Sequence, residues 1–246
     1  MKYLSIVLFG LMLFNCNEKQ NTLVEANDII KESIEVSGGN IIDSSSIKFD
    51  FRDIHYKAVR NNGDFLLARL TVKDTDTIFD LLRNNGFERF INDSLITVPD
   101  SMATKYSASI NSVHYFSVLP YGLDGKAVNK TYLNTVEING KNYHKIKVTF
   151  NQDGGGEDYE DEFIYWVNTK TFKIDYLAYT YDEADGKGLR FREAFNERYV
   201  NGVRFVDYNN FKPKDNNATL ENLDRLFTEN RLEWLSKIEL KDVTVN

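Results

Sequence analysis

Apolar residues recur along this chain with a helical period at first and with an alternating period later. In residues 22–36 they repeat every three or four positions, which predicts an amphipathic helix. A Gly-Gly pair at 38–39 follows, and this is a typical signal for the end of a helix. The pattern then becomes that of strands, and an Asn-Asn-Gly turn predicts a hairpin between strands at 46–60 and 64–73.

A second helix is predicted in the middle of the chain, over residues 101–119. Ser101 is suited to cap its first turn, and Pro120 marks its end because proline disfavours a helical residue before it. The apolar stripe of this helix consists of Met102, Tyr106, Ile110 and Val113. A neighbouring face carries Asn111, His114, Tyr115 and Val118.

From residue 135 onward the chain is predicted to form an antiparallel meander, because short β-type runs alternate with turn residues. Strands joined by tight turns are antiparallel neighbours. The expected strands cover residues 135–138, 142–151, 162–168, 172–182, 189–200 and 203–211. Outside the meander, we expect further strands within 79–96, helices at 126–132 and 220–235, and a last strand at 238–245.

These elements indicate a mainly β protein with a few helices, of the α+β class. A sheet of this length must cover its apolar face, and the helices are the available cover. A strongly curved antiparallel sheet, or half-barrel, wrapped over helices meets this need, and so does a barrel with helical lids. With 246 residues, 3 prolines and no Ser/Gly-rich linker, residues 22–246 are expected to form a single domain.

The first sixteen residues have the features of a bacterial lipoprotein signal peptide. Lys2 provides a positive start, and an apolar run follows that is too short to span a bilayer comfortably. The run ends in Leu-Phe-Asn-Cys, which resembles a lipobox with its cysteine at Cys16. We therefore expect a signal peptide at 1–15, a lipidated Cys16 that anchors the chain to a membrane, and a polar tether over 16–21. A plain secretory signal or an uncleaved apolar start are the alternatives.

Composition narrows the class of protein further. A hydrophobic fraction of 42%, with 13% aromatic residues, is enough for a folded core and excludes a disordered chain. The net charge of −7 argues against nucleic acid as a partner, because that role needs basic surface. One cysteine excludes a zinc finger and a disulfide framework.

Candidate site residues come from the mid-chain helix and from two strands of the meander. Asn111, His114 and Tyr115 share one helix face, either as part of a pocket or as satisfied polar groups that hold the helix to the sheet. In 189–200, alternation places the arginines on the side opposite Leu189, Phe191 and Phe195. The strand candidates are Tyr165, Trp166, Arg190, Arg192 and Asn196.

The two arginines could bind an acidic head group, or they could pair across strands with Asp161, Glu162 or Asp175. The aromatic residues suit a lined groove and an ordinary β core equally well. The groove candidates among them are Tyr115, Phe116, Tyr121, Tyr165, Trp166, Tyr176, Tyr179 and Tyr181.

An acidic run follows three glycines at 154–156, and Asp158, Asp161 and Glu162 are its candidate ligands for a hard cation. The spacing is not that of an EF-hand, and charge runs are usually solvated faces. The three histidines lie in different predicted elements, so their spacing does not indicate a zinc site. We expect no metal and no cofactor.

Several runs together resemble a known family. They are NSVHYFSVLPYGL, YHKIKVTFNQDGGGEDYEDEFIYW, YLAYTY and GLRFREAFNERYVNGVRFVDYNNF. They resemble an uncharacterised family of Gram-negative, Bacteroidetes-type envelope lipoproteins. The shape expected of that family is similar to the lipoprotein-sorting factors LolA and LolB, so the resemblance implies a half-barrel that encloses an apolar groove.

Three functions are consistent with this sequence. The favoured hypothesis is a protein anchored by lipid in the cell envelope, which binds a lipid or another apolar or amphiphilic molecule in a half-barrel groove. The anchor would lie in the outer membrane, on its periplasmic side or at the cell surface. A hydrolase or lyase that uses His114, Tyr115 and Arg192 is a less favoured alternative. A structural envelope lipoprotein without a ligand is the third.

Overall fold

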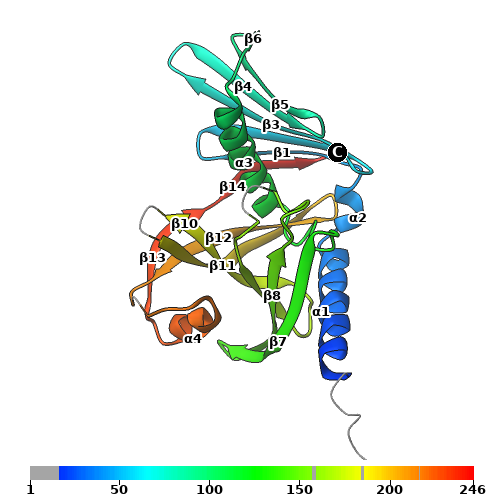
Figure 1. Ribbon diagram of the computed structural model, residues 1–246, viewed down its shortest axis with the longest axis vertical. Helices are drawn as coiled ribbons and strands as arrows, with labels where there is room; N and C mark the ends of the chain where they lie inside the picture. The colour runs from blue at the N-terminus through cyan, green and yellow to red at the C-terminus, as the bar shows by residue number, and fades with distance from the viewer. Residues whose placement is uncertain (1–16, 157–158, 184–185, 216) are drawn as a thin grey trace, which may run out of the picture.

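The computed structural model describes residues 17–156, 159–183, 186–215 and 217–246. Within them, strands dominate and form two antiparallel sheets of seven strands each. Figure 1 shows the two sheets one above the other, with α3 (Asp100–Ser117) in front of the upper sheet and reaching toward the lower one. The mainly β, α+β class predicted from the sequence is confirmed.

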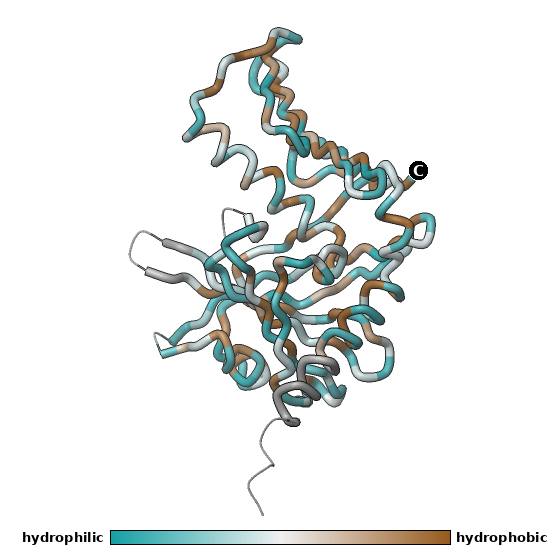
Figure 2. The backbone as a smooth tube through the Cα atoms, turned by 45° about the vertical axis from the view of Figure 1, so that its right-hand side comes forward, coloured by the Kyte–Doolittle hydropathy of each residue, from teal (hydrophilic) through white to brown (hydrophobic). Residues whose placement is uncertain are grey.

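The first sheet is a meander of the early strands, with the order β14-β1-β2-β3-β4-β5-β6. Hydrophobic and hydrophilic residues alternate along its strands in Figure 2, as expected for strands with one face toward a helix. Its strands are β1 (Ser46–Phe51), β2 (Ile54–Asn61), β3 (Asp64–Lys73), β4 (Asp76–Arg83), β5 (Gly86–Ile91), β6 (Ser94–Ile96) and β14 (Leu240–Val245). The ambiguous segment 79–96 is therefore strand.

The second sheet is the predicted late meander, with the order β13-β12-β11-β10-β9-β8-β7. Its strands are β7 (Val128–Ile138), β8 (Lys141–Phe150), β9 (Phe163–Asn168), β10 (Ile174–Glu183), β11 (Gly186–Val200), β12 (Val203–Pro213) and β13 (Leu232–Ile238). Every pair of neighbours is antiparallel, because each strand returns beside the one before it.

The two sheets are joined by one nearly continuous segment. β13 pairs with β12, and after Glu239 the chain continues as β14 and pairs with β1. Asp207 fixes this crossing, because its carboxylate accepts hydrogen bonds from the Leu240 N–H at 3.0 Å and from Arg198 at 3.2 Å. Arg198 also donates to the Leu240 carbonyl at 2.6 Å. The result is one strongly curved β surface, which is the expected half-barrel.

Helices cover both faces of the second sheet. α1 (Asn17–Val36) contacts β7 and contributes Ala26, Ile29 and Ile30 to the core on one face. The opposite face is covered by η1 (Leu220–Asn222) and α4 (Leu223–Thr228). All six residues of β9 are consequently buried.

Phe163 and Trp166 lie on opposite faces of β9. Phe163 belongs to the core beneath α1, and Trp166 belongs to the core beneath α4. Both side chains are buried in a core, because the second sheet has a core on each side.

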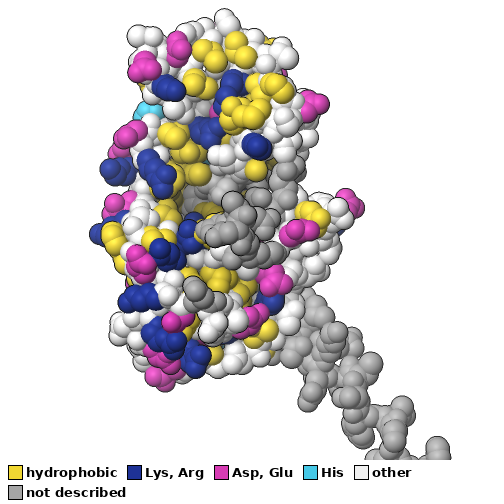
Figure 3. Space-filling view, turned by 60° about the vertical axis from the view of Figure 1, so that its left-hand side comes forward, with side chains coloured by type: hydrophobic (Ala, Val, Ile, Leu, Met, Phe, Trp, Pro, Cys, Tyr) yellow, Lys and Arg dark blue, Asp and Glu magenta, His cyan; other side chains and the backbone are white. Residues whose placement is uncertain are grey.

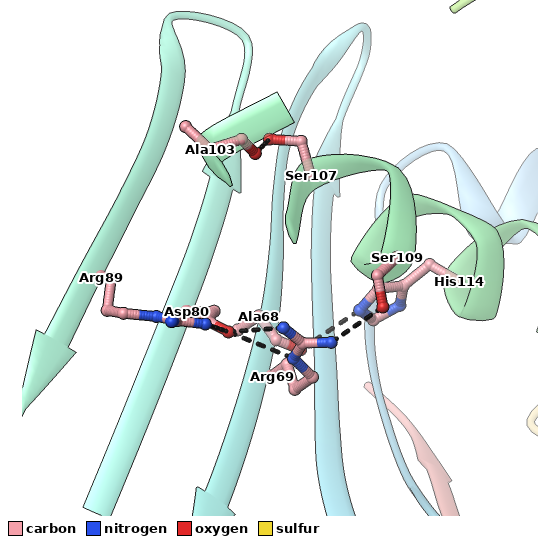
Figure 4. A network of polar contacts seen from close by, with 8 residues as sticks. All are labelled: Ala68, Arg69, Asp80, Arg89, Ala103, Ser107, Ser109 and His114. Atoms are coloured by element: carbon pink, nitrogen blue, oxygen red, sulfur yellow. Dashed lines mark hydrogen bonds and ion pairs between the residues drawn. The ribbon is translucent and has the colours of Figure 1, made fainter. Parts of the chain in front are cut away.

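The first sheet is held to α3 by apolar contacts and by a buried ion cluster. Ile110 packs between Ala58 and Leu67. Asp80, which is 1% exposed, accepts hydrogen bonds from Arg69 at 2.7 Å and from Arg89 at 2.6 Å. Figure 4 shows how the three side chains link β3, β4 and β5, while Arg69 also reaches Ser109 of α3.

One predicted helix is wrong, and another is shorter than predicted. Residues 126–132 enter β7, since from Val128 the side chains alternate between more and less exposed positions. The helix expected at 220–235 ends at Thr228, because Asn230 takes a left-handed conformation with φ 56° and β13 begins two residues later.

The start of the described chain also differs from expectation. α1 begins at Asn17, so residues 17–21 are helical where a polar tether was expected. The predicted C-cap is present, because Gly38 follows α1 with φ 83° and connects it to α2 (Gly39–Ile42). A side chain at Gly38 would collide with the backbone oxygen of Gly202, so both the conformation and the close approach require glycine.

Candidate functional site

A large groove of about 870 Å³ lies between α3 and the second sheet. Its walls come from α3, from β8 to β11, from the loop before β9 and from the helix-facing side of the first sheet. The lining residues are Phe65, Leu82, Ser107, Ala108, Asn111, Ser112, Tyr115, Phe116, Phe150, Gly155, Gly156, Tyr159, Glu160, Asp161, Phe163, Tyr179, Tyr181, Arg190 and Arg192.

Aromatic rings form a large part of the groove wall. The Phe163 ring stacks on Tyr179 with centroids 5.5 Å apart, and Phe116 of α3 lies 5.4 Å from the same tyrosine. The Tyr115 and Tyr165 hydroxyls are 2.7 Å apart, which joins the helix to β9. Burial raises the pKa of both hydroxyls, so these tyrosines stay neutral. This part of the wall is therefore apolar, and its tyrosine hydroxyls are uncharged polar groups.

Arg192 is the buried cation of this wall. It is 9% exposed, and its guanidinium carbon lies 4.0 Å from the centre of the Phe116 ring and 4.9 Å from that of Tyr179. One terminal nitrogen donates to the Tyr179 hydroxyl at 2.7 Å. Its Nε is buried and has no hydrogen-bond partner among the described residues.

A smaller cavity of about 220 Å³ adjoins the groove at Arg192 and Phe116. Three polar side chains line it as cross-strand neighbours on β11, β12 and β13, namely Arg192, Asn210 and Ser236. The full lining is Phe51, Arg52, Ser112, Val113, Phe116, Ser117, Arg192, Val206, Tyr208, Asn210, Ser236, Ile238 and Leu240. We call it the end cavity.

The structure brings together some of the predicted site residues. Asn111, Tyr115, Arg190 and Arg192 all line the groove. Tyr165 joins them through its hydrogen bond to Tyr115. The predicted alternation of β11 therefore places both arginines toward the helix.

His114 points away from the groove, toward the first sheet. It is 1% exposed, its ring lies edge-on to the stacked rings of Phe49 and Tyr56, and its Nε2 lies 3.2 Å from the Ala68 carbonyl (Figure 4). Burial is the main cause that lowers the pKa of His114 to about 3, and the nearby charge of Arg60 contributes to the same shift. The imidazole is thus neutral and donates its Nε2 proton to the carbonyl.

Two other candidates also lie apart from the groove. Trp166 is fully buried on the opposite face of the second sheet, where its indole N–H donates to Asp224 at 3.2 Å. Asn196 has a left-handed φ of 50° within a β-bulge between Phe195 and Arg198. The bulge interrupts the alternation of β11, so Asn196 meets Asp207 at the sheet junction instead of the groove.

The acidic candidates lie at or near the loop before β9. Asp161 lines the groove and Glu162 forms an ion pair with Lys147 at 3.0 Å, whereas Asp158 lies outside the described residues, as does Cys16. Within the described residues, no three His, Cys, Asp or Glu side chains gather closely enough to hold a metal ion.

The second arginine of the groove wall, Arg190, stacks over the Tyr181 ring at 4.5 Å.

Sequence reasoning missed the polar lining of the end cavity, formed by Asn210 and Ser236. Asn210 stands two positions after Tyr208 in the predicted strand 203–211, so alternation puts the two side chains on one face. Ser236 could not be found, since it falls between the predicted helix 220–235 and the predicted strand 238–245.

On the face drawn in Figure 3, hydrophobic side chains gather in patches, and both basic and acidic side chains lie around them. No helix within the described residues is both long enough and apolar enough to cross a bilayer.

Solved structures with a similar fold include a LolA-superfamily protein from Nitrosomonas europaea. It shares 12% identity, with 89% of this chain and 92% of that chain covered, at a TM-score of 0.50. A DUF1329-family protein from Desulfovibrio piger shares 10% identity over 91% and 92% of the two chains at a TM-score of 0.47. Lipoprotein LppX of Mycobacterium tuberculosis shares 14% identity over 67% and 91%, at 0.30.

At these identities the likeness to the LolA-superfamily protein shows a shared fold, as the sequence resemblance implied. No protein with a curated description matches the chain. A family model does match, over residues 2–240, which is nearly the whole sequence. The chain therefore belongs to a family of unknown function, DUF6503.

Proposed function

We propose that this protein is a lipid-anchored protein of the cell envelope that holds an apolar or amphiphilic ligand in the groove between α3 and the second sheet. The observation that carries the proposal is the groove itself, with its aromatic wall and a volume of about 870 Å³. Ligand pockets commonly measure about 300–1,000 Å³ and are lined mainly by apolar and aromatic side chains with a few polar groups.

The aromatic rings of the groove wall also hold one another in place. Phe116, Phe163 and Tyr179 contact one another at ring distances of 5.4 to 6.2 Å, which fixes their orientation. Rigid aromatic side chains lose little conformational entropy when a ligand binds. The LolA-like fold supports the same proposal, since the superfamily's expected form is a half-barrel around an apolar groove.

The position of His114 favours binding over hydrolysis or lyase chemistry. A general base must reach the proton that it removes, and its pKa must lie near the working pH. His114 does not line the groove, and its pKa of about 3 leaves it neutral and weakly basic. Arg192 lines the groove whereas His114 contacts the first sheet, so the two side chains do not form one catalytic site.

Binding can be tested with 1-N-phenylnaphthylamine, a neutral apolar dye that fluoresces in apolar sites. The wild-type protein is expected to enhance its emission saturably. Ala108→Trp places an indole in the groove wall and should weaken binding about tenfold or more, because the large ring occupies ligand volume. Lys105→Trp adds the same ring at an exposed position of α3 and should leave binding unchanged.

Two outcomes would contradict the groove proposal. One is an absence of saturable dye binding to the wild type, and the other is equal binding by both tryptophan variants. The anchor is tested separately, because Cys16→Ser removes the sulfur that would carry the lipid. That variant should move from the membrane fraction to the soluble fraction and lose labelling by radioactive palmitate. Wild-type protein without label would refute the anchor.

A further inference from the structure

Arg192 carries a positive charge in the protein interior, and no Asp or Glu among the described residues forms an ion pair with it. A buried charge is unfavourable unless an opposite charge or several hydrogen bonds compensate it. The buried Arg204 follows this rule, because its Nε donates to Glu197 at 2.6 Å. Arg192 has the Tyr179 hydroxyl and ring faces only, and its Nε has no partner among the described residues. Its surroundings therefore suit an anion that comes from outside the chain.

The end cavity continues this cationic site across the sheet. Asn210 is the cross-strand partner of Arg192, and Ser236 is the partner of Asn210, so the three side chains stand in one row. The Asn210 Oδ1 is also buried without a hydrogen-bond partner among the described residues. An amide can turn to present its NH₂ group instead, and it can then donate to an anion held by Arg192.

The two spaces differ in the charge of their linings. The end cavity is lined by Arg52 and Arg192, and no Asp or Glu is among the described residues that line it. The large groove has Glu160 and Asp161 in its wall together with Arg190 and Arg192. The lining of the end cavity is thus purely positive, which favours a negative group there, whereas acidic and basic residues balance in the groove.

The two spaces are adjacent, because Ser112, Phe116 and Arg192 line both. A molecule can therefore place a small head in the end cavity of about 220 Å³ and a longer apolar part against the aromatic wall. Arg192 presents its guanidinium at the boundary, where a carboxylate or phosphate can accept two hydrogen bonds.

From this arrangement we propose that the ligand is an amphiphile with one anionic head group, a carboxylate or a phosphate. Arg192 and Asn210 bind the head group, and the groove holds the apolar tail. This inference rests on the proposed binding function and adds the chemical class of the ligand and its orientation. The head faces the junction of the two sheets, and the tail follows α3.

The test compares ligands that differ in the head group. Lauric acid, dodecyl phosphate and dodecanol compete with 1-N-phenylnaphthylamine for wild-type protein. We expect the two anionic ligands to displace the dye at concentrations about tenfold or more below that of dodecanol, since hydrogen bonds between charged groups are the strong ones. Equal competition by dodecanol would overturn the proposal, while failure of the dye itself to bind would overturn the binding function instead.

Variants then locate the head group. Arg192→Gln should remove the preference for lauric acid over dodecanol. Arg225→Gln is the matched control, because it removes the same charge from an exposed position of α4 on the opposite face of the second sheet, and it should keep the preference. An equal loss in both variants would indicate a diffuse electrostatic effect and would refute a site at Arg192.

Asn210→Asp gives a second test that does not depend on removing the arginine. The new carboxylate would stand beside Arg192 as its cross-strand partner and take the position proposed for the ligand's head. The variant should melt at a higher temperature than wild type and lose its preference for lauric acid. A lower melting temperature together with an unchanged preference would contradict the proposal.

Free inorganic phosphate distinguishes the two sources of such an anion. Phosphate at the concentrations used for dodecyl phosphate should leave the dye bound and should not protect the protein against thermal unfolding. Protection by inorganic phosphate equal to that by dodecyl phosphate would indicate a site for a free anion, and the amphiphile would be refuted.

Discussion

His114 should make the protein lose stability in mild acid by an amount that can be calculated. Its pKa falls from 6.5 to about 3 in the folded state, because it is 1% exposed and packs edge-on against the stacked rings of Phe49 and Tyr56. The folded state therefore resists protonation, whereas the unfolded chain takes up a proton as pH falls through 6.5. The stabilising contribution is present above pH 6.5 and is lost as pH falls from there toward 3.

The size of the loss follows from linkage. At pH 7 an unfolded histidine is about a quarter protonated, and at pH 5 it is almost fully protonated. The folded group remains neutral at both values, so the free energy of unfolding should fall by about 2 kcal/mol between them. The result depends little on the folded pKa, because any value well below 5 gives nearly the same loss.

The assay is urea unfolding at pH 7 and at pH 5, with wild type and His114→Gln compared. Glutamine keeps a hydrogen-bond donor for the Ala68 carbonyl and does not titrate. Contributions from carboxylates are common to both proteins and cancel in the difference. Wild type should therefore lose about 2 kcal/mol more than the variant. Parallel losses would show that His114 is accessible to protons in the folded state, and the reasoning would fail.

Two further predictions concern the two sheets. Trp166→Ala removes a fully buried ring beneath α4 and should lower the free energy of unfolding by about 3–5 kcal/mol in urea melts. Trp234→Ala, at a position 55% exposed, should lower it far less. Similar losses in the two variants would contradict the assigned burial. Asp80→Asn removes the buried charge that two half-buried arginines share and should cost about 3–5 kcal/mol. Replacing Arg69 and Arg89 by apolar residues in the same variant should raise the urea midpoint again. An unchanged midpoint in Asp80→Asn would mean that the cluster is solvated.

The fold could be predicted from the sequence where its signals are local. Hydrophobic alternation and Asn-Gly turns defined the meander, and Gly38 marked the end of α1. The errors arose where local signals compete with distant contacts. α4 and β13 share one amphipathic stretch, and its split at Asn230 depends on β13 pairing with β12.

The candidate site was predictable only in part. Alternation correctly put Arg190 and Arg192 on one face of β11, and helical spacing correctly put Asn111 on a face turned to a groove. The same spacing could not tell that His114 turns toward the first sheet. Neighbouring positions on a helix differ by about 100° in direction, so a helix between two sheets sends adjacent side chains to different partners. Tyr115 and His114 illustrate this separation.

The crossing of β13 into β14 implies an order of events during folding. Most pairings in both sheets join strands that are neighbours in sequence, so each meander can form from short loops soon after its residues are available. The pairing of β1 with β14 is different, because Ile47 opposes Val245 across nearly the whole chain. Closing so long a loop costs more entropy than closing a hairpin. β14 should therefore dock late, and until it docks the edge of β1 is free to pair with another strand.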